Sequence, residues 1–140
     1  MRTVTDSNGT LIAAARPDPW RVLVVDDDLV LRKLSRRVLE RAGFLVDVAV
    51  DGQEGLDMFR VAGPPYDVVV LDLAMPRMRG EVAFAAMRAL RPEQAFVVAS
   101  GEISKDIEQT MSRHGNVAFL LKPYENAQLV DSVWAATRYS

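Results

Sequence analysis

One apolar run constrains the fold of this chain more than any other feature. Residues 68–71 are Val-Val-Val-Leu, and the run ends at Asp72, with Met75 and Pro76 close behind. Four consecutive apolar residues, three of them β-branched, predict a strand that is buried on both faces, as in a parallel sheet covered by helices. Ligands gather beyond the carboxyl ends of such strands, so Asp72 is a candidate functional residue. An aspartate that only begins a loop or caps a helix is the alternative, and this strand alone leaves both open.

The composition limits the classes of protein to which the chain can belong. Its 140 residues suit one domain with a core of its own. The 17 basic and 19 acidic residues are nearly balanced and form no basic block, so we expect no nucleic-acid partner. The absence of cysteine excludes disulfides, thiolate metal sites and thiol catalysis. The apolar run at residues 11–15 is too short for a signal peptide or a membrane span, and we expect a soluble cytoplasmic protein with no membrane partner.

The first 20 residues differ from the rest of the chain. They mix small polar residues and close with Pro17 and Pro19, which bar a helix and remove two backbone donors. We therefore expect a flexible lead-in over residues 1–20 and one folded domain over residues 21–140.

Five strand patterns alternate with five helix patterns in the folded part. The strands are expected at 21–26, 45–50, 68–72, 95–100 and 116–121. The helices are expected at about 29–42, 52–62, 81–90, 103–111 and 127–137. Parallel strands need crossover helices, and those crossovers are right-handed. The alternation therefore predicts a single α/β domain whose parallel sheet is covered by helices on both faces.

The apolar stripes of the helices predict which faces pack on the sheet. On the first helix this face comprises Leu31, Leu34, Val38, Leu39 and Ala42. On the third helix it comprises Val82, Ala85, Ala86, Ala89 and Leu90. The fourth helix has only Ile103, Ile107 and Met111 at four-residue intervals. Such a thin stripe buries little area, so we expect this helix to be the least firmly held element.

Polar side chains stand at the ends of four of the five strands. They are Asp26 and Asp27 on the first, Asp72 on the third, Ser100 on the fourth and Lys122 on the fifth. These strand ends share one edge of a parallel sheet, so the residues are expected to meet. Crowded carboxylates repel one another unless a cation joins them, and oxygen ligands with bound water suit Mg²⁺. A lysine and a serine hydroxyl suit a phosphoryl group beside that metal, and a carboxylate nucleophile can form an aspartyl-phosphate.

Four segments of the chain resemble the receiver domain of the response regulators of two-component signalling. They are VLVVDDD (22–28), VVVLDLAMP (68–76) with Gly80, VVAS (97–100) and FLLKP (119–123), in order and at family-like spacing. One such segment is weak evidence, whereas four together are specific. The resemblance covers about residues 21–138. It implies a CheY-like, doubly wound (βα)5 domain with strand order 2-1-3-4-5.

The resemblance implies a role for each residue at the strand ends. Asp72 would accept a phosphoryl group from a histidine kinase or a histidine phosphotransfer protein. Asp26 and Asp27 would hold Mg²⁺ directly or through water, with Asp72 and the backbone carbonyl of Ala74 as further ligands. Lys122 would contact the phosphoryl group. The chain would be a phosphoacceptor that catalyses only its own phosphorylation and dephosphorylation, and no enzymatic turnover of an external substrate is expected.

The resemblance also implies a switch. Ser100 would turn toward the phosphoryl oxygen and Phe119 would turn inward behind it, and the peptide bond before Pro123 is expected to be cis. The added charge of about −1.5 to −2 would bias a two-state element, for which the fourth helix is the natural candidate. We expect a downstream protein target and allow for a homodimer through the fourth and fifth helices.

A few positions carry expectations of their own. Asp28 is expected to cap the first helix and not to bind metal. Leu29 and Val30 lie off the inward stripe of that helix, so they form either a kinase-docking face or a partly buried first turn. Ala74 replaces the polar residue often found there, which bears on the dephosphorylation rate. Phe119 replaces the frequent tyrosine, which leaves the switch with packing alone.

Other functions remain as alternatives. A flavin-binding module shares this sheet order, but three aspartates after the first strand would repel a phosphate that no cation accompanies. A phosphatase of the haloacid dehalogenase type needs a second aspartate two residues after the nucleophile, where Ala74 stands. The closest rival is a degenerate receiver that binds proteins without phosphorylation. A stand-alone regulator is favoured over a receiver that belongs to a hybrid kinase.

Overall fold

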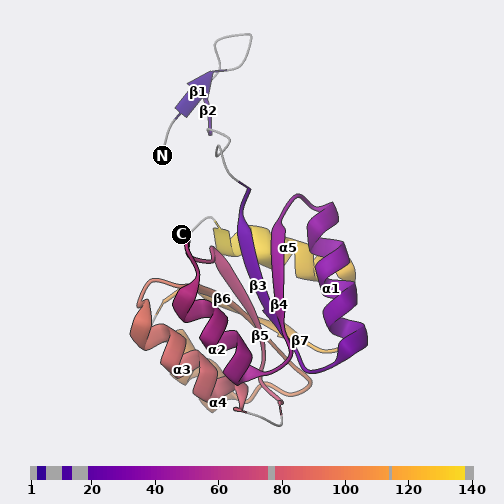
Figure 1. Cartoon of the computed structure of the whole chain (residues 1–140), viewed down its shortest axis with the longest axis vertical. Coiled ribbons are helices and arrows are strands. Elements are labelled where there is room, and N and C mark those ends of the chain that lie inside the picture. Colours follow the sequence, from indigo (N-terminus) through magenta and orange to yellow (C-terminus); the bar gives the residue numbers. More distant parts are fainter. Residues whose placement is uncertain (1–2, 6–10, 14–18, 76–77, 114, 138–140) are drawn as a thin grey trace.

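The computed structural model describes residues 3–5, 11–13, 19–75, 78–113 and 115–137. Two short strands, β1 (Thr3–Thr5) and β2 (Leu11–Ala13), pair antiparallel near the N-terminus (Figure 1). No sequence pattern predicts this pair, because three-residue strands are too short to show a periodic pattern. Pro76, part of the motif after Asp72, lies outside the described residues. No helix in the described ranges is long and apolar enough to cross a membrane.

Five parallel strands form the centre of the α/β domain. They are β3 (Arg21–Val25), β4 (Leu45–Ala49), β5 (Val68–Asp72), β6 (Ala95–Ser100) and β7 (Val117–Leu121). Their order in the sheet is β4-β3-β5-β6-β7, which is 2-1-3-4-5 along the folded part of the chain. This order confirms the predicted fold class. The register aligns Asp72, the last residue of β5, with Ala99, one residue before the end of β6.

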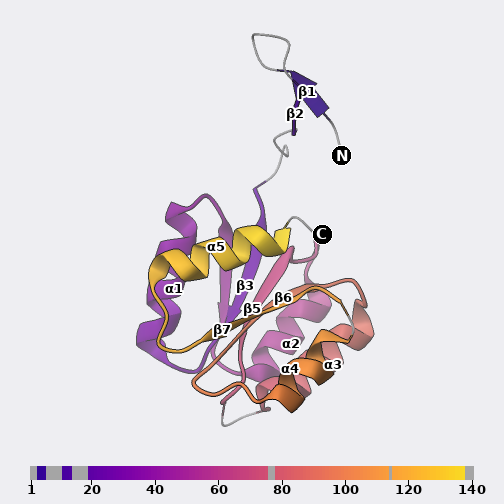
Figure 2. The same ribbon diagram turned by 180° about the vertical axis from the view of Figure 1, so that it is seen from behind.

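Five helices cover the two faces of the sheet. α1 (Leu29–Arg41) and α5 (Asn126–Thr137) lie on one face, and α2 (Gly52–Val61), α3 (Gly80–Leu90) and α4 (Lys105–Ser112) lie on the other (Figures 1 and 2). Each face has its own hydrophobic core. The core under α1 and α5 includes Leu39, Phe44, Leu129 and Val133. The core under α2, α3 and α4 includes Phe59, Phe84, Met87, Phe96 and Met111.

The buried face of α1 differs from the predicted one. Leu39 is buried as expected, but Leu34 is 42% exposed and Ser35 is buried in its place. The face of α1 that is buried against the sheet is therefore rotated from the predicted one, and the small Ser35 side chain lies on it. Leu29 and Val30 are both exposed, which excludes the alternative that these two side chains are partly buried.

The predicted inner face of α3 was wrong. Val82 is 55% and Leu90 51% exposed, and Ala85 and Ala89 are also exposed. Of the five predicted residues only Ala86 is partly buried and packs against the core. The residues that α3 buries are Gly80, Ala83, Phe84, Met87 and Arg88. Two apolar stripes compete on this helix, and the stripe with the larger side chains wins because burying Phe and Met removes more apolar area from water than burying alanines.

The α4 helix has few inward-facing side chains. Ser104 caps it by accepting a hydrogen bond from the Ile107 amide at 3.1 Å. Met111 is its only fully buried residue, and Ile107 is partly buried. Among the described elements, only β7 has its backbone close to that of α4. This arrangement leaves a space between α3 and α4.

Candidate metal and phosphoryl site

Three carboxylates meet at the carboxyl edge of the sheet. Asp26 directly follows β3 and Asp72 ends β5, and both are buried, whereas Asp27 is exposed. One carboxylate oxygen from each of the three lies within 4.8 Å of the others. The parallel topology accounts for this convergence, because β3 and β5 are hydrogen-bonded neighbours that run in the same direction.

The turn after β3 fixes the orientation of the first acids. Asp26 Oδ1 accepts a hydrogen bond from the Asp28 amide at 2.9 Å. Asp28 Oδ1 accepts from the amides of Val30 and Leu31 at 2.9 and 3.0 Å, so Asp28 caps α1 as expected. Because Asp28 is engaged by the helix, the acids available to a cation are those at positions 26, 27 and 72.

Lys122 reaches both buried acids from the end of β7. Its Nζ lies 3.5 Å from Asp26 Oδ2 and 3.4 Å from Asp72 Oδ1. The Lys122 amide donates to the Ser100 carbonyl at 2.8 Å, and the peptide bond to Pro123 is cis. Burial alone would lower the pKa of Lys122, but the charges of Asp26 and Asp72 outweigh it and the pKa is raised. The lysine is therefore a firmly protonated cation beside these acids.

The positive charge beside Asp72 does not balance the negative charge of the three carboxylates. Burial raises the pKa of Asp72 to about 6, from an ordinary value of 3.8. Lys122 and the Ala74 amide, which donates to Asp72 Oδ1 at 3.2 Å, act in the opposite direction, while the Asp26 charge adds to the rise. One ammonium thus does not compensate three converging carboxylates, and the set of oxygen donors suits a small divalent cation.

Gly80 allows the start of α3 to lie directly against the backbone of Asp72. A Cβ atom added at Gly80 would lie 2.4 Å from the Asp72 carbonyl oxygen and 2.5 Å from Leu73 Cα. The Gly80 amide donates to the Leu73 carbonyl at 3.1 Å, which ties the helix start to the chain segment after β5. Any side chain at this position would displace the segment that carries Asp72.

The predicted switch residues lie on β6 and β7. Ser100 is buried at the end of β6, and its Oγ accepts a hydrogen bond from the Glu102 amide at 3.3 Å. Phe119 pairs with Val98 in the sheet register and packs against the core under α4. An open cleft of about 500 Å³ lies beside Ser100, and Ala74 and Ile107 are among its lining residues.

Arg32 is a further residue near the site, and the sequence pattern did not predict it. Arg32 lies off the predicted apolar stripe of α1, yet it is partly buried and its Nη1 donates to the Asp26 carbonyl at 2.9 Å. The signal was its position four residues after the cap Asp28, since side chains one turn into a helix lie over its N-terminal end.

The segments around these residues match a known family. The family model of the response regulator receiver domain matches residues 22–134. This chain belongs to that family. It is therefore a receiver domain of two-component systems, a signalling module and not a classical enzyme.

Individual relatives place the receiver domain in several kinds of protein. The chain is 27% identical over 129 residues to chemotaxis protein CheY of Treponema pallidum (strain Nichols), covering 90% of each chain. It is 31% identical over 135 residues to probable histidine kinase 2 of Oryza sativa subsp. indica, covering 83% of this chain but 13% of the kinase. Its fold is similar to a chain in the CheX-CheY-BeF3-Mg+2 complex from Borrelia burgdorferi, with a TM-score of 0.78, 25% identity and coverage of 84% of this chain and 88% of that one.

Proposed function

We propose that this receiver domain is a phosphorylation-dependent switch that carries a phosphoryl group on Asp72. The observation that carries the proposal is the meeting of Asp26, Asp27 and Asp72 with Lys122 at one edge of the sheet. The donor would be the phosphohistidine of a histidine kinase or a histidine phosphotransfer protein. A carboxylate oxygen of Asp72 forms a bond to phosphorus, the phosphorus–nitrogen bond breaks, and the imidazole of the donor leaves.

The surrounding residues supply what this transfer needs. Asp26, Asp27, Asp72 and the Ala74 carbonyl would hold Mg²⁺, which when bound neutralises charge on the transferring group. Lys122 would hold one phosphoryl oxygen, since its ammonium already lies beside Asp72. The Ser100 hydroxyl would donate to another phosphoryl oxygen after a rotation about its side-chain bond. Dephosphorylation by water is the only turnover that we propose.

The readout would involve the face formed by Ser100, Phe119 and α4. A phosphoryl group adds charge of about −1.5 to −2 at the edge of the cleft beside Ser100. Movement of Ser100 toward that charge makes room for Phe119 to turn inward, and α4 is the neighbouring element with few buried side chains. The exposed Leu29 and Val30 on α1, with Lys33 beside them, are the proposed contact for the phosphoryl donor. A downstream protein, or a second copy of the chain through α4 and α5, would bind the switched face.

Phosphoryl uptake from a small donor tests the proposal without knowledge of the kinase. The chain is incubated with acetyl phosphate and Mg²⁺, and the intact mass is measured. We expect one phosphoryl group on the wild type and none on Asp72→Ala, with Asp131→Ala, an exposed acid on α5, as the matched control. Absence of uptake, together with an unchanged spectrum in beryllofluoride and Mg²⁺, would instead indicate a phosphorylation-independent binding module.

A further inference from the structure

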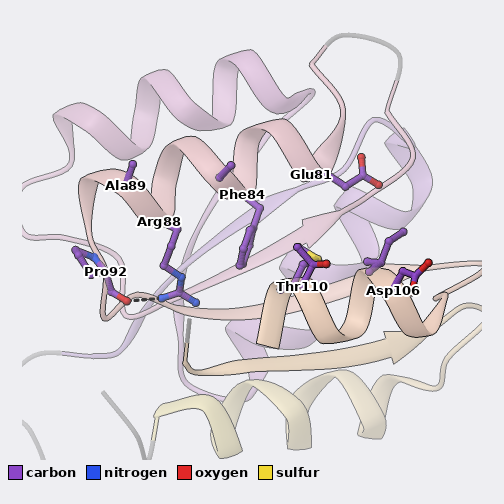
Figure 3. A pocket seen from close by; sticks show the side chains of 10 residues that line it. Glu81, Phe84, Arg88, Ala89, Pro92, Asp106 and Thr110 are labelled. Atoms are coloured by element: carbon purple, nitrogen blue, oxygen red, sulfur yellow. Dashed lines mark hydrogen bonds between the residues drawn. The ribbon is translucent and has the colours of Figure 1, made fainter. Parts of the chain in front are cut away.

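A separate cavity of about 630 Å³ lies between α3 and α4 (Figure 3). Its volume is in the range of about 300–1,000 Å³ that is typical of sites for small molecules. Most of its lining is apolar and comprises Phe84, Ala85, Ala89, Pro92, Ile107 and Met111. The cavity follows from the way α3 packs, because the helix buries its larger stripe and turns Ala85 and Ala89 toward α4.

Arg88 is the basic residue among those that line this cavity. It is only 8% exposed, and its Nη1 donates to the carbonyls of Pro92 and Gln94 at 2.7 and 2.6 Å. Its Nε and Nη2 are buried and have no hydrogen-bond partner among the described residues. The guanidinium carbon lies 5.3 Å from the ring centre of Phe84 and 5.0 Å from that of Phe96. Ring faces attract the charge but do not replace the missing acceptors.

The buried guanidinium of Arg88 combines a positive charge with unused hydrogen-bond donors, which favours an anionic ligand. Burial lowers the pKa of Arg88, and the nearby Glu93 offsets only part of that effect. An arginine nevertheless stays charged in proteins, so the unpaired donors carry a positive charge in an apolar surrounding. Nε and Nη2 form one side of the planar fork, which matches the two oxygens of a carboxylate.

The acids that line the same cavity lie away from Arg88. Figure 3 shows Glu81 and Asp106 at the opposite end, beyond Phe84. An anionic group placed at Arg88 is therefore separated from them by the apolar stretch of the lining. The cavity thus has a positive end at Arg88, an apolar middle and an acidic end at Glu81 and Asp106.

We propose that the cavity between α3 and α4 binds a small molecule with an aromatic body and one carboxylate. Because both nitrogens are buried, the flexible Arg88 side chain must turn toward the cavity for Nε and Nη2 to donate hydrogen bonds to the carboxylate. The aromatic body packs between Ala85, Ala89 and Met111. A free phosphate would satisfy Arg88 but leave the apolar lining uncovered. A neutral aromatic amide would cover the lining but leave the charge of Arg88 unpaired. This proposal does not depend on phosphorylation of Asp72.

Titration of the unphosphorylated full chain with three probes tests the proposal. The probes are 2-naphthylacetate, the neutral 2-naphthylacetamide and inorganic phosphate, followed by amide NMR shifts. We expect saturable shifts at Ala85, Ala89 and Thr110, with at least about ten-fold tighter binding of the carboxylate than of either other probe. Equal affinity for the carboxylate and the amide would overturn the proposal, and so would the absence of saturation up to about 10 mM.

Two variants separate the cavity from the stability of the fold. Ala89→Phe fills the cavity from an exposed position of α3 and leaves Arg88 in place, and Ala135→Phe on an exposed position of α5 is its matched control. We expect about a ten-fold loss of carboxylate binding in the first variant and none in the second. Arg88→Met should weaken binding of the carboxylate but not of the amide. Wild-type affinity in Ala89→Phe would contradict the proposal even if Arg88→Met failed to fold.

Discussion

The Lys122 ammonium lies 3.4 Å from Asp72 Oδ1, a contact between the ends of two strands that are not neighbours in the sheet. The strand between them, β6, brings Ser100 to the same edge. The single cation of Lys122 faces Asp26 as well as Asp72, and the exposed Asp27 adds a third negative charge.

Mg²⁺ is expected to stabilise the folded chain by binding to the three carboxylates. At ten times its dissociation constant a ligand that binds only the folded state raises the free energy of unfolding by about 1.4 kcal/mol. Thermal unfolding with and without Mg²⁺ measures this effect. Asp27→Ala should remove most of it, while Asp131→Ala should keep it. An equal gain in all three proteins would place the ion elsewhere.

Without metal, Asp72 is expected to oppose folding more strongly as the pH rises from about 4 to about 6. Its pKa is about 6 in the folded chain against an ordinary 3.8, so in this window the folded state holds a proton that the unfolded state has released. Asp72→Asn removes this effect. The difference in free energy of unfolding, variant minus wild type, should therefore rise by about 1–2 kcal/mol from pH 4 to pH 7. Urea unfolding in EDTA at several pH values measures this difference. A difference that did not vary with pH would show that Asp72 titrates normally.

Gly80→Ala is expected to damage both stability and the site. The new Cβ would overlap the Asp72 carbonyl oxygen, and overpacking of this kind costs about 1–3 kcal/mol. We also expect slower phosphoryl uptake from acetyl phosphate, because the segment after β5 must shift. Gly101→Ala is the control, since an added Cβ there meets nothing within 4 Å. Similar losses in both variants would show that glycine flexibility matters more than the contact with Asp72.

Asp28→Ala should separate capping from metal binding. Loss of the two hydrogen bonds to the Val30 and Leu31 amides is expected to cost about 1 kcal/mol of stability. Phosphoryl uptake at saturating Mg²⁺ should remain close to that of the wild type. Asp27→Ala should show the reverse, with little loss of stability and an affinity for Mg²⁺ at least about ten-fold lower. Weak Mg²⁺ binding in Asp28→Ala would make Asp28 a ligand.

Strand positions and their polar ends could be predicted from the sequence because each is encoded locally. A run such as residues 68–71 has one plausible environment, and parallel pairing then fixes where its last residue lies. The orientation of the helices was less predictable. On α3 the alanine-rich stripe and the stripe of Phe84 and Met87 are both apolar, and only the sheet determines which is buried. Arg88 was not predicted as buried either, because nothing in a single sequence marks an arginine whose partners are backbone carbonyls after the helix end.

Ile107 and Glu81 line both the cleft beside Ser100 and the cavity between α3 and α4. If these shared residues move when one site is occupied, binding at the two sites is coupled. A ligand in the cavity that holds Ile107 in place would change the lifetime of the aspartyl-phosphate. Phosphorylation would in turn change the affinity of that ligand by the same coupling free energy. A metabolite that binds the cavity would then change the strength of the signal without binding to the kinase.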